Sequence, residues 1–129
     1  MGASTRRVLV VDDEPVIRAL IRASLGRDRR PQLLLAEDGE QALEAARRWK
    51  PDIVLLDVRM PKLDGLEVCR RLRGDSQTAA AKIVMLTAMG QDDDLAEGYA
   101  AGADDYLVKP FDPDALLDKV QSSMGFAAW

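Results

Sequence analysis

The sequence of 129 residues contains no histidine and a single cysteine, Cys69. The missing histidine excludes imidazole catalysis and histidine-ligated metal sites built from this chain alone. One cysteine cannot form an internal disulfide, which favours a reducing compartment. The apolar runs at 8–11 and 53–56 are far shorter than the roughly 20 residues that cross a bilayer, and residues 1–7 lack the apolar stretch of a secretory signal. These absences predict a soluble, cytoplasmic protein that does not act on a membrane.

The charge balance excludes another class of partner. The formal net charge is −4, with 31% charged and 47% apolar residues, an ordinary globular composition. An acidic domain gains nothing from neutralising a phosphate backbone, so we expect no direct nucleic-acid binding by this segment. The length fits one hydrophobic core. We therefore predict a single domain over 1–129, with an ordered core from about residue 6 to about 124.

Short apolar runs alternate with stretches of helical periodicity along the whole chain. The expected strands cover 7–11, 33–36, 53–56, 83–87 and 106–108. The expected helices cover 14–25, 39–49, 66–73, 93–101 and a last segment that begins at Pro113. This alternation predicts an α/β fold with a doubly wound parallel five-stranded sheet and helices on both faces. In such sheets the ligand site lies beyond the carboxyl ends of the strands.

Polar residues stand at four of these strand ends. They are Asp12 and Asp13, Asp57, Thr87 and Lys109. Each has an ordinary explanation when taken alone, as a helix cap, a turn residue, a strand terminus or a solvated surface lysine. Those explanations require the fold to gather three carboxylates, a hydroxyl and an ammonium at one edge by coincidence. A common function for the five residues is the better interpretation.

The chemistry of the cluster indicates phosphoryl transfer. Neighbouring carboxylates repel one another unless a cation or protons neutralise them, and Mg²⁺ prefers oxygen ligands. Transfer of a phosphoryl group needs a metal, cationic groups on the phosphoryl oxygens and a nucleophile in line. Asp57 follows a central buried strand and is the candidate nucleophile, because carboxylates can form aspartyl-phosphates. Thr87 and Lys109 would then bind the phosphoryl oxygens from the other side.

Four segments closely resemble the receiver domains of bacterial two-component response regulators. They are VLVVDDEP at 8–15, LLDVRMPKLDG at 55–65, LTA at 86–88 and GADDYLVKPF at 102–111. The resemblance covers nearly the whole chain and retains every strand-end residue in order. It implies a (βα)5 fold with the flavodoxin-like strand order 2-1-3-4-5.

The resemblance also implies a role for each site residue. Asp57 would accept a phosphoryl group from a phosphohistidine of a sensor histidine kinase or a histidine phosphotransfer protein. Mg²⁺ would be held by Asp13, Asp57 and the backbone carbonyl of Arg59, with Asp12 acting mainly through water. Lys109 would pair with the phosphoryl oxygens, and its bond to Pro110 would be cis. Such a domain is a signalling switch rather than an enzyme, since it catalyses only its own phosphorylation and dephosphorylation.

The same resemblance implies an output surface. Thr87 would turn toward the phosphoryl group, and Tyr106 would move into the vacated space. The face made by helix 93–101, strand 106–108 and the last helix would then bind an effector domain or output protein. Receivers of winged-helix regulators pair through charges on this face, and Asp105 and Lys119 suit that pattern. Helix 93–101 lacks the basic residues that such pairing uses, so a phosphorylation-dependent homodimer stays open.

Two positions beside the predicted site depart from common receiver patterns. The residues two beyond Asp57 and Thr87 are Arg59 and Met89, and neither is a small amide or acid that could orient a hydrolytic water. Arg59 is long enough to lie across the approach to the phosphoryl group and could pair with Glu14. We therefore expect slow self-dephosphorylation.

Three other functions are compatible with parts of the pattern. A flavodoxin-like electron carrier shares the fold, but the acidic run 12–14 would repel the phosphate of FMN. A phosphatase of the aspartyl-phosphate type uses an Asp-x-Asp pair, whereas Asp57 is followed by Val58 and Arg59. A receiver-like binding module that signals without phosphorylation would be expected to lack a site residue, and none is missing.

Overall fold

The structure, a computed structural model, describes residues 6–25, 32–88 and 92–123. The described strands are β1 (Arg7–Val11), β2 (Gln32–Ala36), β3 (Ile53–Asp57), β4 (Lys82–Ala88) and β5 (Asp105–Lys109). The described helices are α1 (Pro15–Leu25), α2 (Gly39–Trp49), α3 (Gly65–Gly74), α4 (Asp92–Ala101) and α5 (Pro113–Ser123). The predicted elements are confirmed, each within one residue at either end. No helix in these ranges is long and apolar enough to cross a membrane.

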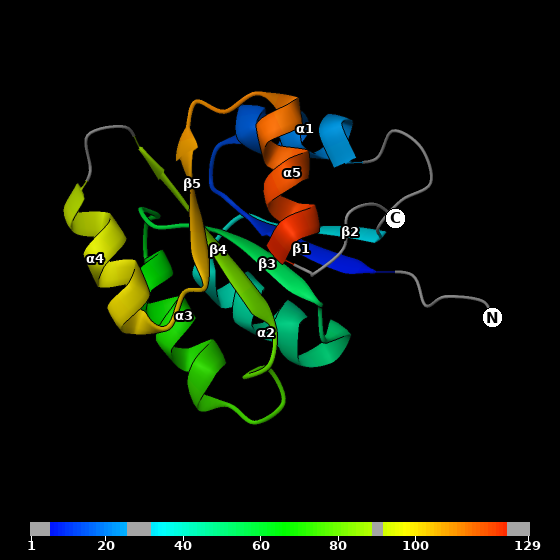
Figure 1. The fold of residues 1–129 in the computed structure, drawn as a ribbon. Coiled ribbons are helices and arrows are strands. Elements are labelled where there is room, and N and C mark those ends of the chain that lie inside the picture. The colour runs from blue at the N-terminus through cyan, green and yellow to red at the C-terminus, as the bar shows by residue number, and fades with distance from the viewer. Residues whose placement is uncertain (1–5, 26–31, 89–91, 124–129) are drawn as a thin grey trace.

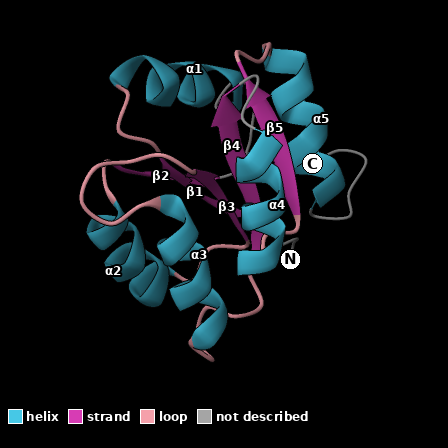
Figure 2. Cartoon of the chain, turned by 90° about the vertical axis from the view of Figure 1, so that its left-hand side faces the viewer, coloured by secondary structure: helices cyan, strands magenta, loops and turns pink. Residues whose placement is uncertain are grey.

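The strands form one parallel sheet in the order β2-β1-β3-β4-β5, which confirms the predicted topology. Helices α2, α3 and α4 cover one face of the sheet, and α1 and α5 cover the other (Figures 1 and 2). This order places β3 between β1 and β4, so its C-terminal residue, Asp57, lies beside the ends of both neighbours.

The alternation of side chains along each strand builds two separate cores. In β1, Leu9 and Val11 pack with α2 and α3, whereas Val8 and Val10 pack with α1 and α5. All four are fully buried, and so are the apolar residues of β3 at 53–56. Continuous burial explains why these strands read as unbroken apolar runs rather than alternating ones.

Three helices begin at an aspartate that accepts a backbone N–H. Asp38 Oδ1 accepts from the N–H of Gln41 at 2.9 Å, Asp64 Oδ1 from Glu67 at 3.0 Å and Asp112 Oδ1 from Ala115 at 2.7 Å. Each cap satisfies a donor that the first turn leaves unpaired. Asp64 also ends the loop that follows Asp57.

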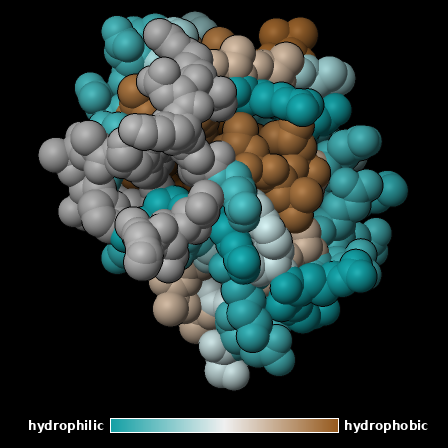
Figure 3. All heavy atoms as spheres, turned by 90° about the vertical axis from the view of Figure 1, so that its right-hand side faces the viewer, coloured by the Kyte–Doolittle hydropathy of each residue, from teal (hydrophilic) through white to brown (hydrophobic). Residues whose placement is uncertain are grey.

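The side of the molecule opposite to that shown in Figure 2 carries an area of apolar side chains bordered by hydrophilic ones (Figure 3). The edge strand β2 exposes Leu34 by 37%, next to a shallow pocket of about 310 Å³ that Ala45 and Trp49 of α2 also line. The charged strand ends described next lie apart from this pocket.

Candidate functional site

The carboxyl ends of the parallel strands bring the predicted acidic residues together. Asp12 and Asp13 follow β1, and Asp57 is the last residue of β3. One carboxylate oxygen from each of the three lies within 4.8 Å of the others. Asp12 is fully buried and Asp57 is 5% exposed, whereas Asp13 is exposed. The predicted acidic cluster is therefore present, with one carboxylate facing solvent.

Lys109, the last residue of β5, extends its ammonium group into this cluster. Its Nζ lies 2.8 Å from Asp12 Oδ2, 3.5 Å from Asp57 Oδ2 and 3.0 Å from Glu14 Oε1. The cation offsets part of the repulsion between the buried carboxylates. The Lys109–Pro110 peptide bond is cis, as the resemblance implied. The sequence did not indicate the contact between Lys109 and Glu14, because the two residues lie 95 positions apart.

Burial and neighbouring charges shift the pKa of Asp57 and that of Lys109. Burial, together with the negative charge of Asp12, raises the pKa of Asp57 from its ordinary 3.8 to about 7. Lys109 and the N–H of Arg59, which donates to Asp57 Oδ1 at 3.2 Å, oppose that rise. For Lys109, burial lowers the pKa, but the carboxylates around it prevail and raise it to about 12. An additional cation near Asp57 would favour the ionised carboxylate.

Thr87 supplies a hydroxyl without a partner at the same edge. It lies in β4 next to Ala88, which pairs with Lys109 in the sheet register. The residue is 3% exposed, and its Oγ1 has no hydrogen-bond partner among the described residues. A buried hydroxyl of this kind is costly unless another group satisfies it. The same edge of the sheet thus has an unused donor, one residue beyond the register partner of Asp57.

Gly65 holds the loop that follows Asp57. Its N–H donates to the carbonyl of Val58 at 2.9 Å, and a Cβ at this position would lie against the backbone carbonyl of Asp57. Only glycine permits this approach. Close backbone contact of this kind is a tertiary feature, and the sequence did not indicate it.

The donor set fits a hard divalent cation. Asp12, Asp13 and Asp57 offer carboxylate oxygens, the ligands that Mg²⁺ prefers, and histidine and thiolate ligands are absent from the cluster. The ammonium of Lys109 lies among these acids, and Thr87 directly follows Leu86, the residue that pairs with Asp57 in the sheet register. The predicted ligand role of the Arg59 carbonyl stays a prediction, and Met89 lies outside the described residues.

Tyr106 lies in β5, away from the carboxylates. Its ring is half-buried and packs against Tyr99 of α4, with centroids 6.1 Å apart at 88°. Lys119 of α5 places its Nζ 5.8 Å from the Tyr106 centroid and 3.2 Å from either carboxylate oxygen of Asp105. The pair expected to suit a dimer is thus made within one chain. The aromatic contact ties α4, β5 and α5 into one surface.

Comparisons with known proteins agree on one family. The family model described as the response regulator receiver domain matches residues 8–121. RpaA of Synechocystis sp., a DNA-binding dual master transcriptional regulator, is 42% identical over 119 residues, which cover 90% of this chain and 48% of RpaA. The alkaline phosphatase synthesis regulator PhoP of Bacillus subtilis is 44% identical over 117 residues, 91% of this chain and 48% of PhoP.

Solved structures show the same fold. A putative response regulator from Chloroflexus aurantiacus superposes with a TM-score of 0.89 at 33% identity, covering 95% of this chain and 99% of that one. Chemotaxis protein CheY4 of Vibrio cholerae gives 0.86 at 35% identity, covering 93% and 99%. The chain spans about half the length of the curated regulators above and nearly all of these two structures.

Proposed function

The chain belongs to the receiver-domain family of two-component response regulators, and from this premise we propose that it is a magnesium-dependent switch phosphorylated on Asp57. The observation that carries the proposal is the set of groups around one buried carboxylate. Two further carboxylates and the ammonium of Lys109 lie around Asp57, and Thr87, whose hydroxyl has no partner among the described residues, directly follows the register partner of Asp57. A buried hydroxyl without a partner is costly, and a phosphoryl oxygen would satisfy it.

Asp57 is the nucleophile. Its carboxylate oxygen forms a bond to phosphorus while the P–N bond of a donor phosphohistidine breaks. The bonding electrons go to the imidazole, which leaves neutral when its other nitrogen carries a proton. The donor is a sensor histidine kinase or a histidine phosphotransfer protein, because this chain has no histidine. Lys109 binds the phosphoryl oxygens, and the hydroxyl of Thr87 donates a hydrogen bond to one of them.

Mg²⁺ fits the oxygen ligands of Asp13, Asp57 and the Arg59 carbonyl, with Asp12 acting mainly through water. When bound, it supplies positive charge that neutralises the phosphoryl oxygens. The protein's own part is to keep Asp57 ionised and oriented. The N–H of Arg59 fixes one carboxylate oxygen, and Lys109 lies near the other.

Phosphorylation changes the face formed by α4, β5 and α5. Thr87 turns toward the phosphoryl group, and Tyr106 follows into the space that Thr87 leaves. The altered face binds an effector domain or output protein, or a second copy in a phosphorylation-dependent homodimer. This acidic domain does not itself bind nucleic acid. It acts in the cytoplasm and has no membrane partner. As a switch it turns over no external substrate.

Labelling by a small phosphodonor tests the assignment. Acetyl phosphate with Mg²⁺ should add one phosphoryl group to the wild type, detected by intact-mass analysis, because the acceptor site carries the catalytic groups. Asp57→Asn should take up none, and chelation of Mg²⁺ should abolish labelling of the wild type. Equal labelling of both proteins would refute Asp57 as the acceptor. No labelling of the wild type would favour a receiver-like module that signals without phosphorylation.

The remaining alternatives are not favoured. The family match and the curated relatives concern response regulators, not electron carriers or phosphatases. In the structure, the buried carboxylates of Asp12 and Asp57 occupy the sheet edge where a flavin phosphate would have to bind. Two buried carboxylates at that edge would repel a phosphate unless a cation intervened.

A further inference from the structure

Helix α4 (Asp92–Ala101) makes little apolar contact with the rest of the chain. Among its residues with described side chains, only Gly98 and Ala101 are buried, Leu95 is half-buried, and Tyr99 is 47% exposed. Apolar burial stabilises by about 25 cal/mol per Å², so a glycine and an alanine contribute little. Polar contacts at the C-terminal end of α4 therefore add to the packing of Tyr99 against Tyr106 of β5.

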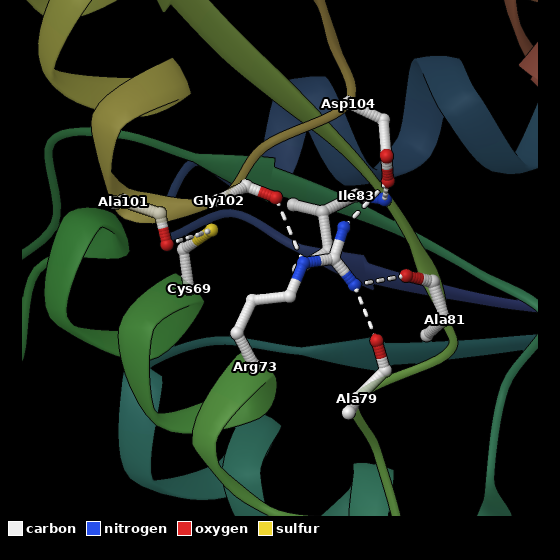
Figure 4. A network of polar contacts seen from close by, with 8 residues as sticks. All are labelled: Cys69, Arg73, Ala79, Ala81, Ile83, Ala101, Gly102 and Asp104. Atoms are coloured by element: carbon white, nitrogen blue, oxygen red, sulfur yellow. Dashed lines mark hydrogen bonds and ion pairs between the residues drawn. The ribbon is translucent and has the colours of Figure 1, made fainter.

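The side chain of Arg73 supplies such contacts from the neighbouring helix α3 (Figure 4). Its Nε donates to the carbonyl of Gly102 at 2.8 Å, directly after α4. One terminal nitrogen donates to the carbonyls of Ala79 and Ala81 at 2.8 and 2.5 Å, and the other pairs with Asp104 at 2.6 Å. One guanidinium thus joins the loop before β4 to the loop between α4 and β5.

Asp104 extends the network into the sheet. Its Oδ2, which binds Arg73, also accepts the N–H of Ile83 in β4 at 2.8 Å, and its own N–H donates to the Ile83 carbonyl at 2.8 Å. Gly102 has a φ of 114°, and a Cβ there would lie 2.7 Å from Arg73 Cγ. The turn after α4 is therefore shaped around the arginine side chain.

The electrostatics of α4 suit this contact. A helix C-terminus leaves carbonyls unpaired and carries partial negative charge, which a nearby cation stabilises. The last turn of α4 contains no basic residue. Arg73 brings the missing cation from α3, and Cys69 of the same helix places its buried thiol 3.5 Å from the carbonyl of Ala101. The end of α4 is thus capped by side chains of another helix.

We propose that Arg73 is the positioning residue that anchors the C-terminal end of α4 and the start of β5, with Asp104 as its acidic partner. This role goes beyond phosphorylation of Asp57 and does not depend on it. Because Tyr106 follows Asp104 by two residues, Arg73 also sets how firmly the α4–β5–α5 face is held.

Hydrogen exchange of the unphosphorylated protein tests this role, without donor and with chelator present. In Arg73→Met, amides of 92–106 should exchange at least about tenfold faster, which corresponds to roughly 1.4 kcal/mol of lost local protection. Amides of β1 and β3 should keep their wild-type rates. In Arg73→Lys, these amides should exchange at a rate between those of the wild type and Arg73→Met. An ammonium retains the charge but cannot bridge four acceptors as the planar guanidinium does.

Arg71→Met is the matched control, since Arg71 lies on the same helix and pairs with Glu67 within it at 3.0 Å. It should leave exchange of 92–106 unchanged. The proposal is overturned if Arg73→Met leaves 92–106 unaffected, or if all amides accelerate in proportion, which would indicate a general loss of stability. Should Arg73→Met fail to fold, Asp104→Asn must still accelerate 92–106 selectively. Failure of Asp57 labelling would leave these outcomes unaltered.

Discussion

Replacing Asp57 by asparagine should stabilise the metal-free protein at alkaline pH. The ionised carboxylate is buried beside Asp12, and these two conditions raise its pKa from 3.8 to about 7. A carboxyl group whose pKa is higher in the folded state stabilises the fold below the unfolded value, and this stability is lost as the pH rises through the folded value. In chelator, the free energy of unfolding of the wild type should therefore fall between about pH 4 and about pH 7. The Asp57→Asn variant should lack this pH-dependent loss of stability.

The magnitude follows from the same values. A rise from 3.8 to about 7 corresponds to a ceiling of about 4 kcal/mol, at about 1.4 kcal/mol per tenfold change. Part of that loss is complete by about pH 5, so the share between about pH 5 and about pH 8 is about 3 kcal/mol. The substitution also removes the ion pair of Asp57 with Lys109, but Lys109 keeps Asp12 at 2.8 Å and Glu14 at 3.0 Å.

Urea unfolding at about pH 5 and about pH 8, with chelator and with Mg²⁺, measures the effect. The difference in unfolding free energy between Asp57→Asn and wild type should grow with pH in chelator. It should shrink when Mg²⁺ neutralises the wild-type cluster. Asp118→Asn, which removes an exposed carboxylate of α5, is the control and should show neither trend. A wild type and an Asp57→Asn variant that lose stability in parallel would refute the repulsion argument.

Two further predictions concern the loop and the lifetime of the phosphorylated form. Gly65→Ala should destabilise the fold by about 2 kcal/mol and slow labelling, because the added methyl group meets the Asp57 carbonyl. Gly74→Ala is the control, since a Cβ at Gly74 has nothing within 4 Å. Equal melting temperatures of the two variants would contradict the packing argument. The double variant Arg59→Asn with Met89→Glu should lose its phosphoryl group about tenfold faster than the wild type after donor removal, a change of roughly 1.4 kcal/mol in the barrier. An unchanged rate would show that these two side chains do not obstruct the water that hydrolyses the phosphoryl group.

The order and type of the elements could be predicted from the sequence because they depend on local periodicity. Apolar runs such as 53–56 indicate strands buried on both faces, and caps such as Asp112 mark helix starts within a few residues of the pattern. The strand-end positions of Asp12, Asp57, Thr87 and Lys109 followed from the topology, since parallel strands end at one edge. The pattern did not indicate which of these groups would touch.

Partner choice depends on contacts between segments that lie far apart in the chain. Lys109 meets Glu14 across 95 residues, a contact that no local pattern indicates, and the suggested pairing of Arg59 with Glu14 stays a prediction. Arg73 meets Asp104 across 31 residues, and its position on α3 resembles that of any solvated arginine until the turn at Gly102 is built around it.

The sequence by itself determined the alternation of strands and helices, and with it the sheet edge where the carboxylates gather, because burial patterns repeat every two or 3.6 residues and are local. Only the tertiary structure decided that Lys109 lies among Asp12, Asp57 and Glu14 and that Arg73 caps a helix other than its own. A long cationic side chain can reach several acceptors. Sheet register and helix packing set which acceptors lie within about 3 Å of it, and hydrogen bonds and ion pairs are strong only at that separation.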